Sequence, residues 1–144
     1  IDSRHLPTIE KNITENTSLC GSILDERFTI GQSDLFENIS GTFDFILCNP
    51  PYIDKATNTV ATSVTDHEPH LALFGGLAGM EIIARILAQA PHYLTPCGQL
   101  WLEHEPFQTA TIAARASASG FTVTTYPDQY STLRYSVLAQ PMAQ

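Results

Sequence analysis

The 144-residue chain is predicted to be an α/β protein with an open, mostly parallel sheet and an antiparallel C-terminal strand. Apolar runs typical of strands alternate along it with segments of helical periodicity, which is the order expected when helices cover a sheet. Close to its end, residues 121–126 and 134–139 alternate apolar and polar side chains, which is typical of antiparallel neighbours. The length corresponds to one domain, so residues 1–144 are predicted to form a single one.

The first half of the chain contains one predicted helix and two predicted strands. Apolar side chains recur at helical spacing over residues 6–15, which predicts an amphipathic helix. Residues 27–31 form a short β-prone run. Residues 43–48 are nearly all apolar and lie between Gly41 and Pro50. Such a run is typical of a strand that is buried on both faces of a parallel sheet.

The second half opens with a polar stretch, residues 54–70, which is predicted to be a long loop or lid. Apolar residues then step by three and four over residues 79–94, which predicts a helix that Pro96-Cys97-Gly98 ends. The remaining predicted elements are a strand over 99–103, an Ala-rich helix over 109–119 that stops at Gly120, and the two final strands.

The charge balance argues against nucleic acid as a direct partner. The net charge is −8, from 7 Lys+Arg against 15 Asp+Glu, and the basic residues are scattered. A protein that grips DNA or RNA neutralises phosphates with clustered Lys and Arg. No apolar run approaches the length of about 18 residues that a membrane helix needs, so no membrane association is expected.

Cysteine and histidine spacing predicts no metal site. The three cysteines form no Cys-x-x-Cys pair, and no histidine pair has ligand spacing. His104, between two glutamates, is predicted to be either solvated or a residue that supports other side chains of a site. No signal peptide is visible at the start of the sequence. We therefore expect an intracellular protein, either cytoplasmic or mitochondrial.

Three polar side chains are predicted to lie at one edge of the sheet. Asn49 directly follows the strand over 43–48, Asp34 follows the run over 27–31, and Asp2 would follow a strand ending at Ile1. Ligands of open α/β sheets bind beyond the carboxyl ends of the strands. This edge is therefore the predicted site.

The sequence Asn49-Pro50-Pro51-Tyr52 predicts a rigid corner at that edge. Each proline fixes its own φ, and each removes a backbone N–H. The corner would present the Asn49 side-chain oxygen and the Pro50 carbonyl as two acceptors for one NH₂ group, while the Tyr52 ring stacks on the planar group.

Methylation of an amide or amino nitrogen is the chemistry that suits this corner. The lone pair of such a nitrogen is delocalised, so it is a poor nucleophile. Two acceptors placed off its plane would favour a pyramidal nitrogen and stabilise the positive charge that develops during transfer.

The corner after an apolar strand resembles the signature of amino-nitrogen methyltransferases, and the chain is similar to the HemK/PrmC family of protein-(glutamine-N5) methyltransferases. Matching segments are Gln32–Phe36, Glu68-Pro69, Leu102–His104 with Gln108, and Arg134. The resemblance implies a class I methyltransferase (Rossmann-like) fold. The family's glycine-rich loop is absent before Asp2, so residues 1–144 are expected to be the C-terminal part of an N-terminally truncated catalytic domain.

The resemblance also implies a cofactor, a substrate and residue roles. The cofactor would be S-adenosylmethionine, and the substrate the glutamine of the Gly-Gly-Gln loop of a peptide chain release factor. The implied cofactor-binding residues are Asp2 for the ribose, Asp34 and Leu35 for the adenine, and Asn49 for the methionine end. Asn49, Pro50 and Tyr52 would be catalytic, and Asn49, Pro50, Pro51, Tyr52 and Ile53 would line the substrate channel.

Two alternatives remain at this point. The same tetrapeptide suits the amino group of a flipped adenine, so a DNA or RNA adenine-N6 methyltransferase is the second hypothesis. The third is an inactive fragment that serves as a scaffold or partner subunit.

Overall fold

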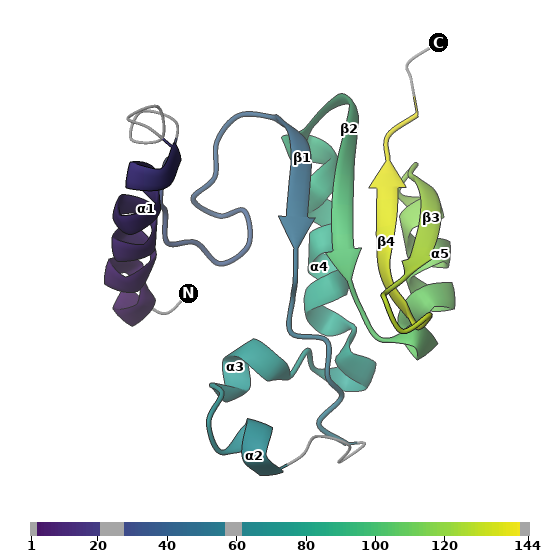
Figure 1. Ribbon diagram of the computed structural model, residues 1–144. Helices are drawn as coiled ribbons and strands as arrows, with labels where there is room; N and C mark the ends of the chain where they lie inside the picture. The colour runs from purple at the N-terminus through teal and green to yellow at the C-terminus, as the bar shows by residue number, and fades with distance from the viewer. Residues whose placement is uncertain (1–2, 21–27, 57–61, 142–144) are drawn as a thin grey trace. The chain divides into compact units, whose positions relative to one another are not determined.

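The computed structural model describes residues 3–20, 28–56 and 62–141 (Figure 1). The chain divides into two compact units, Ile1–Ser40 and Gly41–Gln144.

The first unit contains one long helix. After a 3-10 turn at Ser3–His5, α1 spans Leu6–Cys20 and extends the predicted helix by five residues. Pro7 lies in the first turn, where its missing N–H costs no hydrogen bond. The strand predicted over 27–31 is wrong for residues 28–31, which have no regular structure. A β-prone run forms a strand only when another strand completes its hydrogen bonds, and the described part of this unit supplies none.

The second unit is built on a four-stranded sheet of order β1-β2-β4-β3. β1 (Phe43–Cys48) is parallel to β2 (Leu94–Glu103), while β4 (Leu133–Ala139) is antiparallel to both β2 and β3 (Thr122–Pro127). Three strands therefore run in one direction and the C-terminal strand runs against them (Figure 1). The predicted sheet, including its antiparallel C-terminal strand, is confirmed.

β1 has the predicted bounds but not the predicted burial. Phe45 and Leu47 are 63% and 76% exposed, and Phe43 on the same face is also exposed. β1 is the edge strand of the described sheet, and within the described residues its outward-pointing face has no covering layer. An apolar composition shows that both faces of a strand can be buried. It does not show that another layer of the protein covers each face.

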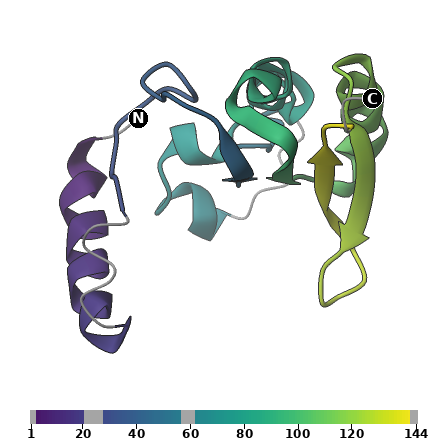
Figure 2. The same cartoon turned by 90° about the horizontal axis from the view of Figure 1, so that it is seen from above.

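Two helices cover the other face of the sheet (Figure 2). They are α4 (Glu81–Gln89) and α5 (Thr109–Ala118), and both match predicted helices. α4 ends earlier than predicted, because a 3-10 turn, Ala90–Tyr93, replaces its last turn at Pro91, which has no N–H to donate. The fully buried core side chains come from these helices and from β2 and β4: Ile83, Ile86, Leu87, Leu100, Leu102, Ile112 and Leu138.

The predicted break at Pro96-Cys97-Gly98 is a bulge inside β2. The register jumps from Phe43↔Leu94 to Phe45↔Gln99, and Cys97 has a φ of +68°. A Cβ on Gly98 would lie 3.0 Å from the Phe43 carbonyl oxygen, so the bulge brings the two backbones together where only glycine fits.

The predicted lid is partly helical. It contains the single-turn helix α2 (Thr62–Thr65) and leads into α3 (His70–Leu73). A glycine-rich turn, residues 75–79, then connects α3 to α4, and its last three residues, Leu77–Gly79, form a 3-10 helix. In the part of the chain that the structure describes, no helix has the length and apolarity to cross a bilayer.

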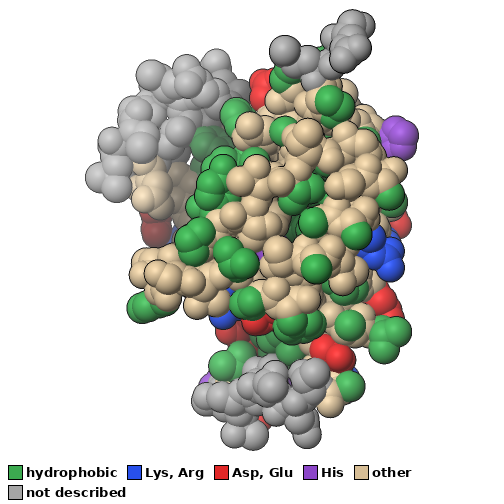
Figure 3. All heavy atoms as spheres, turned by 90° about the vertical axis from the view of Figure 1, so that its right-hand side faces the viewer, with side chains coloured by type: hydrophobic (Ala, Val, Ile, Leu, Met, Phe, Trp, Pro, Cys, Tyr) green, Lys and Arg blue, Asp and Glu red, His purple; other side chains and the backbone are tan. Residues whose placement is uncertain are grey.

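Charged side chains do not gather in one patch on the face shown in Figure 3, where apolar and uncharged groups predominate. The few Lys and Arg side chains on it stand apart from one another (Figure 3). This view agrees with the scattered basic residues of the sequence.

Candidate active site

The Asn49–Tyr52 corner lies at the carboxyl end of β1, where β2 also ends. Its far side is tied to the chain after the lid by a short parallel bridge between Ile53 and Phe74. The Ile53 N–H donates to the Leu73 carbonyl at 3.0 Å, and the Gly75 N–H donates to the Ile53 carbonyl at 3.0 Å. The corner is therefore held at both ends.

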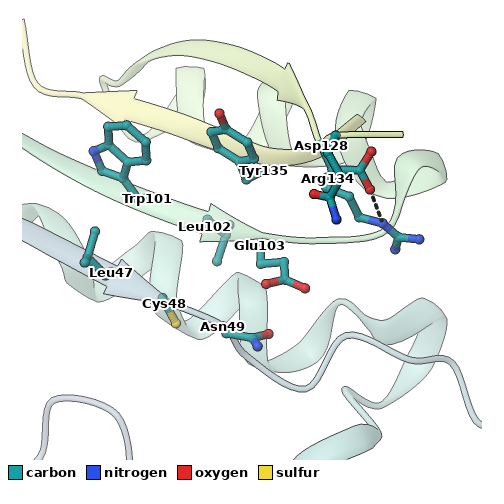
Figure 4. Close-up of a pocket in the computed structure, with 10 residues that line it drawn as sticks. Leu47, Cys48, Asn49, Trp101, Leu102, Glu103, Asp128, Arg134 and Tyr135 are labelled. Carbon is teal, nitrogen blue, oxygen red and sulfur yellow. Dashed lines mark ion pairs between the residues drawn. The ribbon is translucent and has the colours of Figure 1, made fainter. Parts of the chain in front are cut away.

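An open groove of about 700 Å³ runs along the sheet and ends at this corner. Figure 4 shows Asn49 and the Glu103 carboxylate at one end of it, with the rings of Trp101 and Tyr135 further along the strands. These two rings are stacked, with centroids 5.9 Å apart. The groove thus combines a polar end with an aromatic floor.

A second, smaller pocket of about 120 Å³ lies on the other side of the corner. It is lined by Asn49, Pro50, Tyr52, Ile53, Glu68, Ala72 and Leu73. Asn49 is the residue that both cavities share. Its side chain therefore stands where a ligand in the groove and a group in the small pocket would meet.

The two predicted acceptors of the corner are available. Among the described residues, neither the Asn49 side-chain amide nor the Pro50 carbonyl forms a hydrogen bond. Asn49 is exposed, whereas Pro50 is buried. Pro50 is one of the residues that line the small pocket, and a carbonyl beside a pocket can accept a hydrogen bond from a ligand.

Tyr52 is held by a contact that sequence reasoning missed. Its hydroxyl donates at 2.9 Å to Oε1 of Glu103, which is the last residue of β2. Burial, followed by this hydrogen bond, raises the pKa of Tyr52 to about 12, so the hydroxyl stays a neutral donor. The sequence carried one signal for Glu103, its position in the segment that resembles the methyltransferase family.

The other side chains at this edge offer no nucleophile. Burial raises the pKa of the Cys48 thiol to about 11, so it remains protonated. Arg134 pairs with Glu105 at 2.8 Å, and its Nε lies 3.9 Å from Asp128. The hydrogen bond to Glu105 raises the pKa of Arg134, so the guanidinium remains charged.

Of the two roles predicted for His104, solvation is wrong, because the side chain is fully buried. Its Nδ1 lies 2.9 Å from the Glu105 carbonyl oxygen and its Nε2 lies 2.8 Å from the Ser136 hydroxyl. Since a carbonyl only accepts, Nδ1 carries the proton and Nε2 accepts from Ser136. His104 is thus part of the core beneath the site. No group of His, Cys, Asp and Glu that could hold a metal ion occurs among the described residues.

The predicted site residues fall into three sets. Asn49, Pro50, Tyr52 and Ile53 lie together around the small pocket, and Pro51 lies next to them with its carbonyl against Gly75. Asp34 and Leu35 belong to the first unit, in a turn closed by the Glu37 N–H and the Asp34 carbonyl at 3.2 Å. Asp2 lies outside the described residues.

Three curated relatives share sequence with the chain. A ribosomal protein uL3 glutamine methyltransferase from Bordetella pertussis is 46% identical over 81 residues, which cover 56% of this chain and 27% of the relative. A release factor glutamine methyltransferase from Deinococcus radiodurans is 36% identical over 114 residues, covering 79% and 40%. A 4-amino-L-phenylalanine/4-methylamino-L-phenylalanine methyltransferase from Streptomyces pristinaespiralis is 40% identical over 87 residues, covering 60% and 30%.

The chain therefore matches less than half the length of each of these relatives. No family model matches the chain. The predicted resemblance to glutamine methyltransferases is confirmed over the matched residues.

Two solved structures show the same fold at low identity. The E. cuniculi Mtq2–Trm112 complex, responsible for the methylation of the eRF1 translation termination factor, matches with a TM-score of 0.52 and 19% identity over 83% of this chain and 68% of that chain. A methyltransferase from Pyrococcus furiosus matches with a TM-score of 0.50 and 21% identity over 73% and 44%. The predicted methyltransferase fold is confirmed.

Proposed function

We propose that this chain, a relative of protein-glutamine methyltransferases, carries the catalytic corner of an enzyme that methylates a glutamine side-chain amide with S-adenosylmethionine. The observation that carries the proposal is the pair of available acceptors, the Asn49 side chain and the Pro50 carbonyl, beside a small pocket at the carboxyl end of a parallel strand. Both acceptors sit on a proline-locked backbone, so they are in place before a substrate arrives.

The corner would act by holding the amide nitrogen. The Asn49 side-chain oxygen accepts one N–H of the substrate carboxamide and the Pro50 carbonyl accepts the other. These two hydrogen bonds strengthen as positive charge develops on the nitrogen, so they stabilise the transition state more than the ground state. The cation formed by adding a methyl group to the amide nitrogen is acidic and loses one N–H proton to water, which gives the neutral N-methyl amide, so no general base is needed. The Tyr52 ring, anchored through its hydroxyl to Glu103, forms a wall of the pocket.

Four residues would hold the cofactor. Asp34 and Asp2 offer carboxylates for its hydroxyl and amino groups, and Leu35 offers an apolar surface for its adenine. The Asn49 side chain, exposed in the groove, offers both a donor and an acceptor for the amino-acid end. By chemical type alone, these side chains suit the hydroxyl, amino and apolar groups of S-adenosylmethionine. When bound, the cofactor supplies an electrophilic methyl group.

The proposed substrate is the glutamine of the Gly-Gly-Gln loop of a peptide chain release factor. The Deinococcus radiodurans relative and the E. cuniculi complex, which both act on termination factors, support it. The Bordetella pertussis relative acts on ribosomal protein uL3, so a glutamine of uL3 is the second candidate substrate.

The charge balance favours a protein substrate over nucleic acid. The net charge of −8 opposes the approach of a phosphate backbone.

The direct experiment incubates the intact protein that contains this chain with methyl-labelled S-adenosylmethionine and purified release factor, and in parallel with uL3. We expect mass spectrometry to find one added methyl group on a glutamine, and none with the Asn49→Ala variant. Label on neither protein would refute glutamine methylation of both substrates, and methyladenine in added nucleic acid would support the adenine alternative.

A further inference from the structure

Gln108 is a buried side chain that joins three segments beneath the corner. It is 1% exposed and lies just before α5. Its Nε2 donates to the Tyr52 carbonyl at 2.9 Å and to the Ala78 carbonyl at 2.9 Å. Its Oε1 accepts the Glu105 N–H at 2.9 Å. One amide therefore connects the corner, the glycine-rich turn and the end of β2.

Only a primary amide of this length can make these contacts. The two carbonyls require two donors and the Glu105 N–H requires an acceptor, and glutamine supplies all three from one terminal group. A glutamate at this position would set a carboxylate against two carbonyls. An apolar side chain would leave these three part-buried backbone groups without the side-chain partner that Gln108 gives them, which is costly.

The glycine-rich turn is shaped to let Gln108 reach the corner. Gly79 has a φ of +66°, and a Cβ added there would collide with the Tyr52 carbonyl and with the Gln108 amide. A Cβ on Gly75 would collide with the Pro51 carbonyl. Both glycines thus allow a close backbone approach to the two residues that follow Pro50.

The corner needs an external donor because it has few of its own. Pro50 and Pro51 have no N–H, so the backbone at this point cannot form the hydrogen bonds that usually stabilise a turn. Gln108 supplies a donor from another part of the chain, directly at the carbonyl of Tyr52. Two residues before that carbonyl lies the Pro50 carbonyl, one of the proposed acceptors.

We propose that Gln108 is a positioning residue for methyl transfer: through the Tyr52 and Ala78 carbonyls it holds the Pro50 carbonyl and the Asn49 side chain in the geometry that grips the substrate amide. This inference rests on the proposed function. Gln108 touches neither substrate nor cofactor and acts through the corner alone. A misplacement of about 1 Å can cost on the order of 100-fold in rate, so loss of Gln108 should lower kcat more than it changes KM.

The test compares Gln108→Glu and Gln108→Met with a matched control, Gln140→Glu, in the intact protein. Gln140 also donates its side-chain amide to a backbone carbonyl, that of Pro91 at 2.8 Å, but at the opposite end of the sheet. Initial rates are corrected for the folded fraction measured by denaturant unfolding. We expect both Gln108 variants to lower kcat by about 100-fold, with KM changed by only a few-fold, and the control to keep the wild-type kcat. Equal kcat in all three variants after correction would overturn the proposal.

A second measurement does not depend on activity. Backbone amide exchange at Ile53 and Gly75 reports how firmly the corner is held, since both N–H groups form its supporting hydrogen bonds. We expect faster exchange at these two amides in the Gln108 variants than in Gln140→Glu at matched global stability. If the wild-type protein methylates no glutamine, the proposed function fails while exchange still decides whether Gln108 holds the corner; unchanged exchange would refute that role.

Discussion

Asn49 is proposed to contribute to catalysis far more than to stability. Its side chain is exposed and forms no hydrogen bond among the described residues, so folding gains little from it. We expect Asn49→Ala to raise the barrier to methyl transfer by roughly 2.7–4 kcal/mol, by analogy with the removal of one oxyanion-hole donor. The free energy of unfolding should change by no more than about 0.5 kcal/mol.

Labelled methyl transfer and thermal unfolding of the same protein samples check this expectation. A loss of melting temperature that alone accounts for the loss of rate would contradict it.

His104 makes stability depend on pH. Burial lowers its pKa below the ordinary value of 6.5, so the unfolded chain takes up a proton at a higher pH than the folded chain does. The contribution of His104 to the free energy of unfolding is therefore complete above about pH 6.5, and it is lost as the pH falls towards the lower pKa of the folded state. Protonation also puts a second N–H on the ring, where Nε2 now accepts from Ser136.

Denaturant unfolding at about pH 7.5 and pH 5.5 measures this contribution. We expect the wild-type protein to lose more stability between these two pH values than His104→Gln loses. His92→Gln, which replaces an exposed histidine, is the matched control. An identical pH dependence in all three proteins would exclude His104 as the titrating group.

At the scale of elements, the glycine-rich turn is coupled to the corner by close backbone contact. Gly79 and Gly120 both have a positive φ, +66° and +85°, but only a Cβ at Gly79 would meet other atoms within 4 Å. Alanine at Gly120 should cost about 1–2 kcal/mol, the penalty of a left-handed conformation. Alanine at Gly79 should cost more, because the added methyl group displaces the Tyr52 carbonyl, and it should also slow methyl transfer.

The free energy of unfolding and the rate of methyl transfer are measured for Gly79→Ala and Gly120→Ala. The difference between the two variants gives the effect of the steric contact, because both share the conformational penalty. Equal destabilisation of Gly79→Ala and Gly120→Ala, with unaltered transfer in both, would show that the turn and the corner are not coupled.

For β1, the sequence predicted the bounds of the strand correctly but its burial incorrectly. Its apolar run predicted its bounds, but Phe45 and Leu47 remain exposed on the described sheet. Local composition determines that a segment prefers to be extended. The layers above and below a strand depend on other parts of a fold, which the segment itself does not encode.

For the whole molecule, the charge distribution predicts no affinity for bare nucleic acid. The net charge is −8, and the basic side chains form no patch on the face of Figure 3. Non-specific binding requires the release of counterions by several Lys and Arg side chains together. We therefore expect fluorescence anisotropy with labelled single-stranded RNA and DNA to show no saturable binding at about 0.15 M salt.

A protein carrying a clustered basic patch, measured on the same oligonucleotides, provides the positive control. Binding that weakens steeply with added salt would contradict the expectation and would favour the adenine hypothesis.

The strands of the second unit, helices α4 and α5, and the position of the corner after β1 could all be predicted from the amino-acid sequence. These features follow from short-range patterns, namely apolar periodicity, β-prone runs and paired prolines. The run over 27–31 was predicted in the same way and is not a strand over its described residues, because no strand in the described part of the first unit completes its hydrogen bonds.

The distant residues that support the corner could be identified only in the folded chain. Gln108 contacts Tyr52 across 56 positions of the chain, and Glu103 reaches the same tyrosine across 51. His104 is flanked by two glutamates yet lies in the core, because Ser136 on β4 satisfies its ring nitrogen. Such contacts depend on how strands and turns meet in space, and hydrogen bonds between them leave no periodic pattern in the sequence that could reveal them.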